Sequence, residues 1–362
     1  WIGSLGSTGF NAVGEILSGK VNPSGRLSDT YAYDLTSSPA YWNAGDFTYS
    51  NLDHHYVEYA EGIYVGYRFY ETRYVDNTTG ICDEAAYAKA VQYPFGYGLS
   101  YTTFAYSDLQ VNADTVTFTL TNTGSCAGAE VAQLYVAKPD AKVFRPAKEL
   151  KGFVKVFLQP GESKSVTIPL DDKTFRYWNV TTDRWEVEGG SYRLLVGANV
   201  QDIRLTAEIA LPGTGAPDPY AGKELAHYRT AHVQEVPDAE FEALLGRPLP
   251  EETTAIDRTM TLGELHHSRS PLCWLIAGVL TLLVRSGEKR GKPNLNILFQ
   301  YNMPLRGLAQ MTGGIIGEET VDGLVLEAKG FWVIGILRAL VGLVQNAVAN
   351  SRYQAKLDEQ SR

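Results

Sequence analysis

Apolar and polar residues alternate strictly along the middle of the chain. From 115 to 121 every second residue is Val, Phe or Leu, and each of its neighbours is Thr. The same period of two recurs at 165–170 and 203–209. This period predicts strands with one buried face, and Gly-containing turn sequences separate the runs. Residues 105–212 are therefore predicted to form a seven-stranded, immunoglobulin-like β-sandwich.

The first thirty residues follow a helical period instead. Four apolar residues share one helix face: Phe10, Val13, Ile16 and Leu17. Gly19 suits the end of this helix, residues 1–5 resemble the end of a strand, and NPSG at 22–25 has the composition of a type I turn. One strand, one helix and a turn cannot bury their own apolar face. Residues 1–30 are thus predicted to be the terminal piece of an α/β sandwich whose other layer lies elsewhere.

Helical signals return after a stretch rich in Pro and Gly. Residues 213–237 are interpreted as a linker, and residues 238–362 as an α-helical extension. Asp238 is expected to cap the first helix of this extension. Thr261 and Glu264 have the spacing of a capping box for a later one.

Two apolar stretches stand out in the extension. The stretch 272–284 has about thirteen residues, fewer than the roughly twenty that cross a bilayer. The stretch 331–344 is interrupted by Arg338 and predicts an amphipathic helix. Both helices are expected to be buried or to face a protein partner. Contact of these tail helices with a membrane surface is the alternative.

Tyrosines crowd the connecting segment 31–104, which contains fourteen of the 22 in the chain. Aromatic rings stack on sugar faces while their polar ends bond hydroxyl groups, so Tyr41, Trp42 and Tyr49 are candidate substrate-binding residues. The alternative is an irregular connection whose tyrosines pack against the domains on either side. Both interpretations are open at this point.

Charge and cysteine content exclude several classes of protein. The net charge is −9 and no long run of Lys and Arg occurs, which argues against nucleic acid as a partner. Cys82, Cys126 and Cys273 are far apart and odd in number, so they fit neither a zinc site nor a disulfide framework. The six histidines lack metal-binding spacing, and His266 and His267 are expected to point apart. No metal and no cofactor is expected.

Candidate chemistry is sparse in the residues themselves. Glycoside hydrolysis needs two carboxylates beside the sugar, and no pair stands out among the 41 acidic residues. Glu61 and Arg68 are the most suggestive polar pair, for which a structural ion pair is the simpler interpretation. The glycines of FGYGLSY at 95–101 lack the spacing of a phosphate-binding loop, and no GxSxG elbow occurs. The residues alone therefore identify no reaction and no catalytic residue.

Several stretches together resemble glycoside hydrolase family 3. FNAVGEILSGKVNPSGRLSDT at 10–30 resembles the end of the second domain of that family. Further stretches resemble the segments after that domain, including a fibronectin type III-like domain: YAEGIYVGYRFYET at 59–72, YPFGYGLSYTTF at 93–104, TNTGSCAGAEVAQLYV at 121–136, RPAKELKGFVKVFLQPGESKSVTIPL at 145–170 and WEVEGGSYRLLVGA at 185–198. The resemblance covers residues 1–212, and the tail is similar to a helical extension of some bacterial members.

The resemblance implies that the catalytic residues lie in domains other than the fibronectin-like one. In the family, a (β/α)8 barrel carries the nucleophilic Asp, and an α/β sandwich usually carries the acid/base Glu. The fibronectin-like domain comes last. The nucleophile stands in a Ser-Asp-Trp-like motif, and neither Asp29 nor Asp108 has that setting. No catalytic role is carried over to these two residues, nor to Glu15 or Glu61.

The chain is therefore expected to be the C-terminal part of a retaining β-glucosidase or β-xylosidase, inactive alone. Its partner would be the barrel and α/β half, possibly as a separate chain, and the substrate a carbohydrate with a terminal β-linked sugar. The competing hypothesis is a non-catalytic carbohydrate- or protein-binding module built on the sandwich and the helical tail. The residues after Trp1 lack a signal-peptide pattern, and the compartment stays open.

Overall fold

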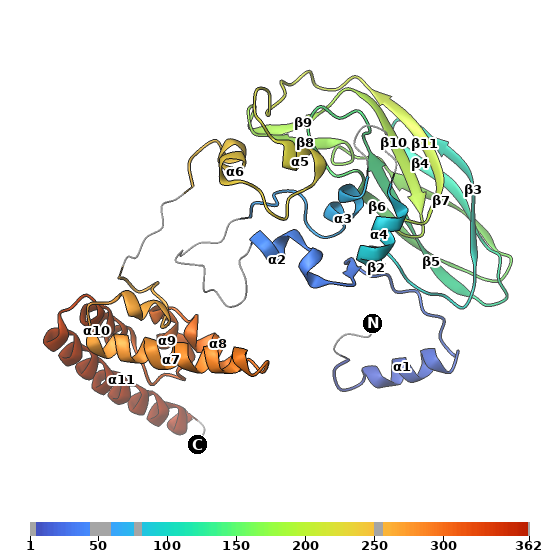
Figure 1. Cartoon of the computed structure of the whole chain (residues 1–362). Helices are drawn as coiled ribbons and strands as arrows, with labels where there is room; N and C mark the ends of the chain where they lie inside the picture. The colour runs from blue at the N-terminus through green and yellow to red at the C-terminus, as the bar shows by residue number, and fades with distance from the viewer. Residues whose placement is uncertain (1–4, 44–58, 76–81, 250–255, 361–362) are drawn as a thin grey trace. The chain divides into compact units, whose positions relative to one another are not determined.

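The computed structural model describes residues 5–43, 59–75, 82–249 and 256–360. They belong to two compact units, the first ending at Leu249 and the second formed by residues 256–360. The first unit contains the strands and the Tyr-rich segment, and the second is helical (Figure 1).

Two antiparallel sheets form the larger part of the first unit (Figure 1). One has the order β11-β10-β5-β6 and the other β3-β4-β7. The strands are β3 (Phe104–Val111), β4 (Thr115–Asn122), β5 (Gly128–Ala137), β6 (Glu149–Leu158), β7 (Ser163–Pro169), β10 (Gly190–Gly197) and β11 (Ile203–Leu211). A separate hairpin consists of β8 (Arg176–Asn179) and β9 (Arg184–Val187). The strands thus occupy the region that the alternating pattern predicts.

The apolar residues of the alternating pattern form the core of the two sheets. On β4, Val116 pairs with Ile168 of β7 and Phe118 pairs with Val166, and all four are buried. The other sheet contributes buried residues to the same cluster: Ala132, Leu134, Val136, Leu158, Tyr192, Leu194 and Val196. Burying a Val, Leu, Ile or Phe side chain stabilises a fold by about 1.5–3 kcal/mol. This cluster is therefore a main source of the stability of the first unit.

The Tyr-rich segment forms a second core in the same unit. Its elements are β1 (Tyr31–Ala32), η1 (Leu35–Ser37), α2 (Pro39–Asn43), α3 (Tyr67–Arg73), α4 (Glu84–Ala90) and β2 (Val91–Tyr93). Tyr64, Phe69 and Tyr87 are buried in this core. The hydroxyl of Tyr64 donates to the carbonyl oxygen of Tyr228 at 2.6 Å. The hydroxyl of Tyr228 in turn donates to the carbonyl oxygen of Ala60 at 2.7 Å. These tyrosines combine apolar packing with satisfied hydroxyl groups.

Part of the expected linker belongs to this second core. Leu225 and Tyr228, at α5 (Ala226–Thr230), are buried there, as is Phe241 of α6 (Asp238–Leu245). The prediction that Asp238 caps α6 is wrong, because the cap position is held by Pro237 and makes no side-chain bond. Asp238 instead lies in the first turn, where the helix dipole favours a negative charge.

The N-terminal helix α1 (Gly9–Leu17) buries none of its residues. Phe10 and Leu17 of the predicted apolar stripe are 70% and 78% exposed. The strand expected at 1–5 lies, except for Leu5, outside the described residues. The predicted turn at 22–25 is wrong, because residues 22–27 form neither a hydrogen-bonded turn nor a bend. Side-chain bonds of Asn22 to other segments hold this stretch open.

The second unit is a helical assembly whose elements are η2 (Glu264–His267), α7 (Pro271–Lys289), α8 (Leu295–Tyr301), α9 (Leu305–Met311), α10 (Glu318–Ala328) and α11 (Trp332–Gln360). The capping box is confirmed at η2. Thr261 N–H donates to Glu264 Oε2 at 2.7 Å, and Glu264 N–H donates to Thr261 Oγ1 at 3.2 Å. α10 buries Val321 and Val325 in the core with Cys273 and Ala277 of α7.

Both apolar stretches of the tail form helices that are mostly exposed. α7 and α11 are each long and apolar enough to cross a membrane by length and composition, and 17% of the apolar window of each is buried. On α7, Cys273 and Ala277 are buried, whereas Leu275 and Leu282 are 65% and 69% exposed. Burial therefore does not hold for most of these side chains, and a surface that faces a protein partner stays a prediction.

Candidate functional site

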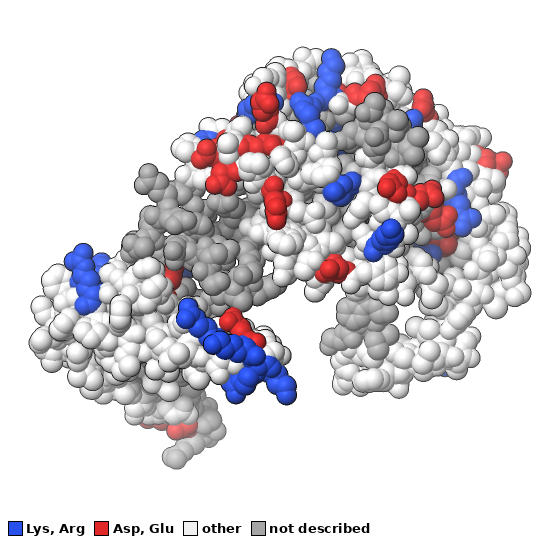
Figure 2. Space-filling view, in the orientation of Figure 1, with Lys and Arg blue, Asp and Glu red and all other residues white. Residues whose placement is uncertain are grey.

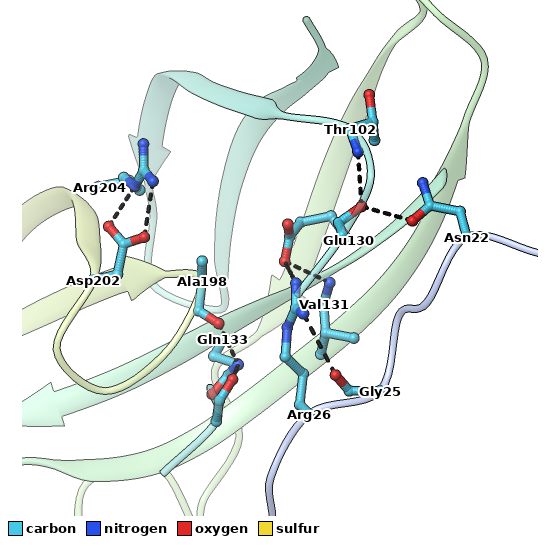
Figure 3. A network of polar contacts seen from close by, with 12 residues as sticks. Asn22, Gly25, Arg26, Thr102, Glu130, Val131, Gln133, Ala198, Asp202 and Arg204 are labelled. Atoms are coloured by element: carbon cyan, nitrogen blue, oxygen red, sulfur yellow. Dashed lines mark hydrogen bonds and ion pairs between the residues drawn. The ribbon is translucent and has the colours of Figure 1, made fainter. Parts of the chain in front are cut away.

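Arg26 joins the N-terminal segment to the sandwich (Figure 3). Its Nη2 lies 2.6 Å from Oε1 of Glu130 on β5, and the two side chains are only 11% and 5% exposed. The same carboxylate oxygen accepts the backbone N–H of Val131 at 2.8 Å. Leu27 exchanges two backbone hydrogen bonds of 2.8 Å with residues 96–97. The NPSGRL stretch is thus fixed by an enclosed ion pair and a short ladder.

Asn22 forms a second connection to the sandwich. Its Oδ1 accepts the N–H of Tyr101 at 2.8 Å and the hydroxyl of Ser100 at 3.1 Å. Its Nδ2 donates to the carbonyl of Ala127 at 3.0 Å. An amide is the side chain that both donates and accepts in this way. The Asn of the motif therefore has a structural role that the sequence alone did not reveal.

The two glycines of the FGYGLSY stretch lie close to other segments of the first unit. A Cβ at Gly98 would collide with the carbonyl oxygen of Gly25. Gly96 has a φ of 79°, a conformation that side chains disfavour, and a Cβ there would meet the amide of Gln133. Close backbone approach accounts for both positions, and the stretch is a packing feature.

Glu71 of α3 is an enclosed carboxylate that ties the Tyr-rich segment to the sandwich. Its Oε1 accepts the hydroxyl of Tyr87 at 2.6 Å. Its Oε2 accepts Nε2 of Gln201 at 2.5 Å and lies 3.1 Å from Nζ of Lys148. Burial raises the pKa of Glu71 above its ordinary value, while the charge of Lys148 opposes the shift. Because protein groups occupy both oxygens and the side chain is fully enclosed, the role of Glu71 is structural.

Two of the three predicted sugar-binding residues lie within the described residues. Tyr41 and Trp42 of α2 stand edge to face, with ring centroids 5.6 Å apart and planes at 76°. Trp42 is 47% exposed, and its Nε1 donates to the carbonyl of Thr36 at 2.6 Å. Tyr49 lies outside the described residues. An exposed indole with a fixed orientation suits stacking on a sugar, and its role in binding stays a prediction.

Glu61 and Arg68 do not form the expected ion pair. Glu61 Oε2 accepts Nδ2 of Asn43 at 2.9 Å, and the same amide donates to the carbonyl of Val233 at 2.9 Å. Arg68 pairs instead with Glu149 of β6, at 3.5 Å. The Glu61 carboxylate and the Asn43 amide thereby anchor the end of α2, next to the aromatic pair.

The carboxylates considered from motifs have local structural partners. Asp29 accepts the N–H of Thr30 at 2.9 Å. Asp108 has a φ of 55°, and a hydrogen bond from the Ser107 hydroxyl at 2.7 Å lowers its pKa. Glu15 pairs with Lys20 on the surface. None of these contacts resembles two carboxylates placed on either side of a sugar.

Neither the potential metal ligands nor the cavity of the second unit indicates a reaction. No group of three potential metal ligands occurs among the described residues. His266 and His267 do not diverge as expected, since their ring centroids lie 3.7 Å apart on the tight turn η2. A cavity of about 790 Å³ is lined by residues from Leu295 to Met311, around α8 and α9, without any carboxylate. It is therefore not a site for glycoside hydrolysis.

Family models match two ranges of the chain. The model described as the glycosyl hydrolase family 3 C-terminal domain matches residues 1–67, and that described as a fibronectin type III-like domain matches residues 130–200. The ion pair of Arg26 and Glu130 therefore links the two matched ranges.

Named relatives match larger shares of the chain. The thermostable beta-glucosidase B of Acetivibrio thermocellus is 36% identical over 322 residues, which cover 87% of this chain and 36% of that protein. The exo-alpha-(1->6)-L-arabinopyranosidase of Bifidobacterium breve is 42% identical over 220 residues, or 59% of this chain and 26% of that protein. The longer match extends beyond the first unit into the helical one.

A solved structure agrees with these matches. The crystal structure of the GH3 beta-glucosidase of Bifidobacterium adolescentis aligns with a TM-score of 0.51 at 38% identity. The alignment covers 64% of this chain and 32% of that one. The chain thus spans between about a quarter and about a third of the length of the proteins it matches.

Proposed function

This chain belongs to glycoside hydrolase family 3 as a C-terminal portion with a fibronectin type III-like domain, and from this we propose that it is the non-catalytic part of a retaining β-glycosidase. The complete enzyme would remove a terminal non-reducing β-linked sugar through a covalent glycosyl intermediate. Two carboxylates about 5–5.5 Å apart perform that chemistry. In this proposal both lie on residues outside this chain, and so the chain alone is inactive.

The exposed stripe of α1 carries the proposal. α1 lies in the range matched by the family 3 model, yet it buries none of its residues. An uncovered apolar stripe on a helix of an α/β layer favours a partner layer that covers it. The partner in this proposal is the barrel and α/β half of the enzyme. Arg26 and Asn22 then hold the completed layer against the sandwich.

The aromatic pair of α2 has a second role in this proposal. Trp42 and Tyr41 would border the sugar-binding cleft, with Tyr49 nearby in sequence. The indole is exposed, oriented by its bond to Thr36, and carried on a helix that Asn43 anchors. The names of the relatives include beta-glucosidase and an arabinopyranosidase, which supports the reaction class and leaves the sugar open.

The test is purification of the protein from its own host through a tag on this chain. Intact mass under denaturing conditions is measured with hydrolysis of aryl β-glucosides, β-xylosides and α-L-arabinopyranosides. We expect turnover together with either a second polypeptide or a chain heavier than 39.8 kDa plus the mass of the tag. Phe10→Asp with Leu17→Asp should lower the activity at least tenfold, whereas the matched control Leu35→Asp, at another exposed leucine, should not.

A single species of 39.8 kDa plus the tag, without turnover, would contradict the proposal. That outcome would favour the alternative, a binding module that acts without a catalytic half. Relatives named as glycosidases do not favour this alternative. Glycan-array binding by the isolated species would then identify its ligand.

A further inference from the structure

α7 of the second unit has two apolar faces, and only one of them is covered. Cys273 and Ala277 on the inner face are buried in the core with α10. On the outer face, exposed apolar side chains recur three or four positions apart: Leu272, Leu275, Ile276, Val279, Leu282 and Leu283. This spacing is that of a second amphipathic stripe. Among the described residues, none of these side chains belongs to the apolar core of the second unit.

α11 repeats this arrangement. Its inner face packs closely on α10, because a Cβ at Gly335 would collide with the backbone of Glu327 and one at Gly342 with that of Thr320. The opposite face exposes Val333, Leu337, Leu340, Val341, Val344 and Val348. At 1.5 Å per residue this stripe is about 24 Å long. Soluble monomers rarely expose apolar patches larger than a few hundred Å², so such a stripe indicates a binding surface.

Two indole rings lie where these helices begin. Trp332 Nε1 donates to the carbonyl of Arg269, just before α7, at 3.2 Å. Trp274 Nε1 donates to the carbonyl of His266 at 2.5 Å. Both rings are exposed over about half of their surface or more. A ring with a bonded N–H and a bare apolar body suits the boundary between water and lipid.

Exposed cations gather at the other end of α7. Figure 2 shows Lys and Arg over this end of the helical unit. The sequence places Arg285, Lys289, Arg290 and Lys292 there, all exposed, together with a single acid, Glu288. Residues 256–360 contain eleven Lys and Arg and nine Asp and Glu, although the whole chain has a net charge of −9. Arg258 and Arg338 pair with acids of α10, whereas the cations at 285–292 form no ion pair with α10 in the part of the chain that the structure describes. The uncovered stripe thus ends in a positively charged surface.

We propose that the outer faces of α7 and α11, with the cations at 285–292, bind the surface of an anionic lipid bilayer. The apolar stripes would enter the boundary between headgroups and acyl chains, and the cations would contact anionic headgroups. This charge complementarity distinguishes a lipid surface from a purely apolar protein partner. The proposal is independent of the glycosidase activity proposed above.

The geometry favours lying on the bilayer over crossing it. The inner face of α7 packs in the core of the unit through Cys273 and Ala277. Midway along the apolar part of α11, Arg338 pairs with Glu319 at 2.9 Å and with Asp322 at 2.7 Å. Crossing would take these charges into hydrocarbon or break the core. A peripheral position preserves both.

The test is flotation of the full chain with vesicles of phosphatidylcholine, with and without about 30% phosphatidylglycerol. We expect binding to the anionic vesicles. It should weaken at least tenfold when phosphatidylglycerol is omitted, and markedly at about 0.5 M salt, where exposed charges are screened.

Two variants separate the apolar and the ionic contributions. Leu275→Gln with Leu282→Gln, and Lys289→Glu with Arg290→Glu, should each weaken vesicle binding at least tenfold. Matched controls on the first unit are Phe153→Gln with Phe157→Gln, and Lys89→Glu with Lys155→Glu, all at exposed positions. The controls should bind as the wild type does. Circular dichroism should show the same fold in all five proteins, because every changed side chain is exposed.

Three results would overturn the proposal. The first is absence of binding to anionic vesicles at low salt. The second is an equal loss of binding in the control variants. The third is sedimentation of the wild type as a dimer that Leu275→Gln with Leu282→Gln converts to a monomer, without vesicle binding. That last result would identify a second copy of this chain as the occupant of the surface.

Discussion

The Glu71 carboxylate lies 3.1 Å from the ammonium group of Lys148, which also donates to the carbonyl of Val200 at 2.7 Å. The pair connects α3 with two segments of the sandwich. The side chain of Glu71 is fully enclosed and that of Lys148 is 17% exposed. In such a setting the loss of one partner costs more than the interaction itself, because the other group stays desolvated.

Replacement of Glu71 should therefore destabilise the first unit to a degree set by the shape of the new side chain. Glu71→Ala removes three polar partners and should lower the free energy of unfolding by about 3 kcal/mol. Glu71→Gln keeps the volume and can turn its oxygen toward Lys148 and Gln201 while its NH2 donates to the Tyr87 hydroxyl, so it should cost less, about 1 kcal/mol. Urea unfolding measures both, with Glu84→Gln on the exposed surface of α4 as the control. Equal losses for the two Glu71 variants would contradict this account.

The contribution of Glu71 to the free energy of unfolding should decrease as the pH rises. Burial raises the pKa of Glu71 in the folded state above its ordinary 4.5, so folding favours the protonated form. The contribution of this group to stability is then fully present below pH 4.5 and is lost as the pH rises through the higher folded-state pKa. Glu71→Gln should lack this part of the decline. The comparison is between unfolding free energies of the two proteins, measured in steps from pH 4 upward.

The ion pair of Arg26 and Glu130 should show strong coupling. Arg26→Met or Glu130→Met leaves one nearly enclosed charge unpaired, and each should cost about 3–5 kcal/mol. The double variant should cost much less than the sum, because neither charge remains. A double-mutant cycle by urea unfolding tests this expectation. Additive losses would show that the two side chains act independently.

Two glycines of the second unit should respond in opposite directions to alanine. A Cβ at Gly323 would collide with the backbone of Ala339 and Gly335, so Gly323→Ala should separate α10 from α11 and destabilise the unit by more than about 2 kcal/mol. Gly278 lies inside α7 with open space around it, and Gly278→Ala should stabilise the helix by up to about 1 kcal/mol. Thermal unfolding of the two variants distinguishes packing from helix propensity.

The thiols should differ in reactivity. Burial and the neighbouring Glu327 raise the pKa of Cys273 to about 11, and its Sγ donates to Glu327 Oε2 at 3.3 Å. Cys126 is exposed. With a thiol reagent at pH 8, Cys126 should react at once and Cys273 only after unfolding. Because folding favours the neutral thiol, the stability that it contributes is present below pH 9 and is lost as the pH rises through about 11. Peptide mapping by mass spectrometry measures the rate of modification at each cysteine. Fast modification of Cys273 in the folded protein would contradict this prediction.

Trp42 should affect sugar binding without affecting the fold. In the complete enzyme, Trp42→Ala should raise KM for an aryl glycoside about tenfold, equivalent to about 1.4 kcal/mol, with a smaller effect of Trp42→Phe. Trp178→Ala, at a similarly exposed indole of the β8–β9 hairpin, is the control. An unchanged KM in Trp42→Ala would remove this residue from the sugar-binding rim.

Local patterns predicted the strands and the capping box. A strand with one buried face must alternate, so Val116 and Phe118 revealed β4. Thr261 and Glu264 fulfilled the capping box because its bonds join residues three apart. In contrast, the contact of Tyr64 with Tyr228 joins positions 164 apart. Nothing in the composition of 213–237 indicated that this stretch completes a core.

The candidate site could be predicted only in part. Aromatic density pointed to Tyr41 and Trp42, of which Trp42 is exposed, whereas the partner of Arg26 lies 104 positions away and has no local signal. Hydrophobicity marked α7 as a helix, but it does not state whether an apolar face is covered. The sequence offers no candidate for the catalytic carboxylates.

β6, the last strand in the order β11-β10-β5-β6, has consequences for solubility. Its outward positions alternate lysine with phenylalanine: Lys151, Phe153, Lys155 and Phe157. An open strand edge is a template for pairing with another chain, and exposed phenylalanines would strengthen such pairing. Lys155 is exposed, whereas Lys151 pairs with Glu149 at 3.3 Å. If two β6 edges met with their Lys155 side chains opposite each other, these charges would repel. Neutralising Lys155, for example by acetylation, would therefore favour association of two chains through this edge.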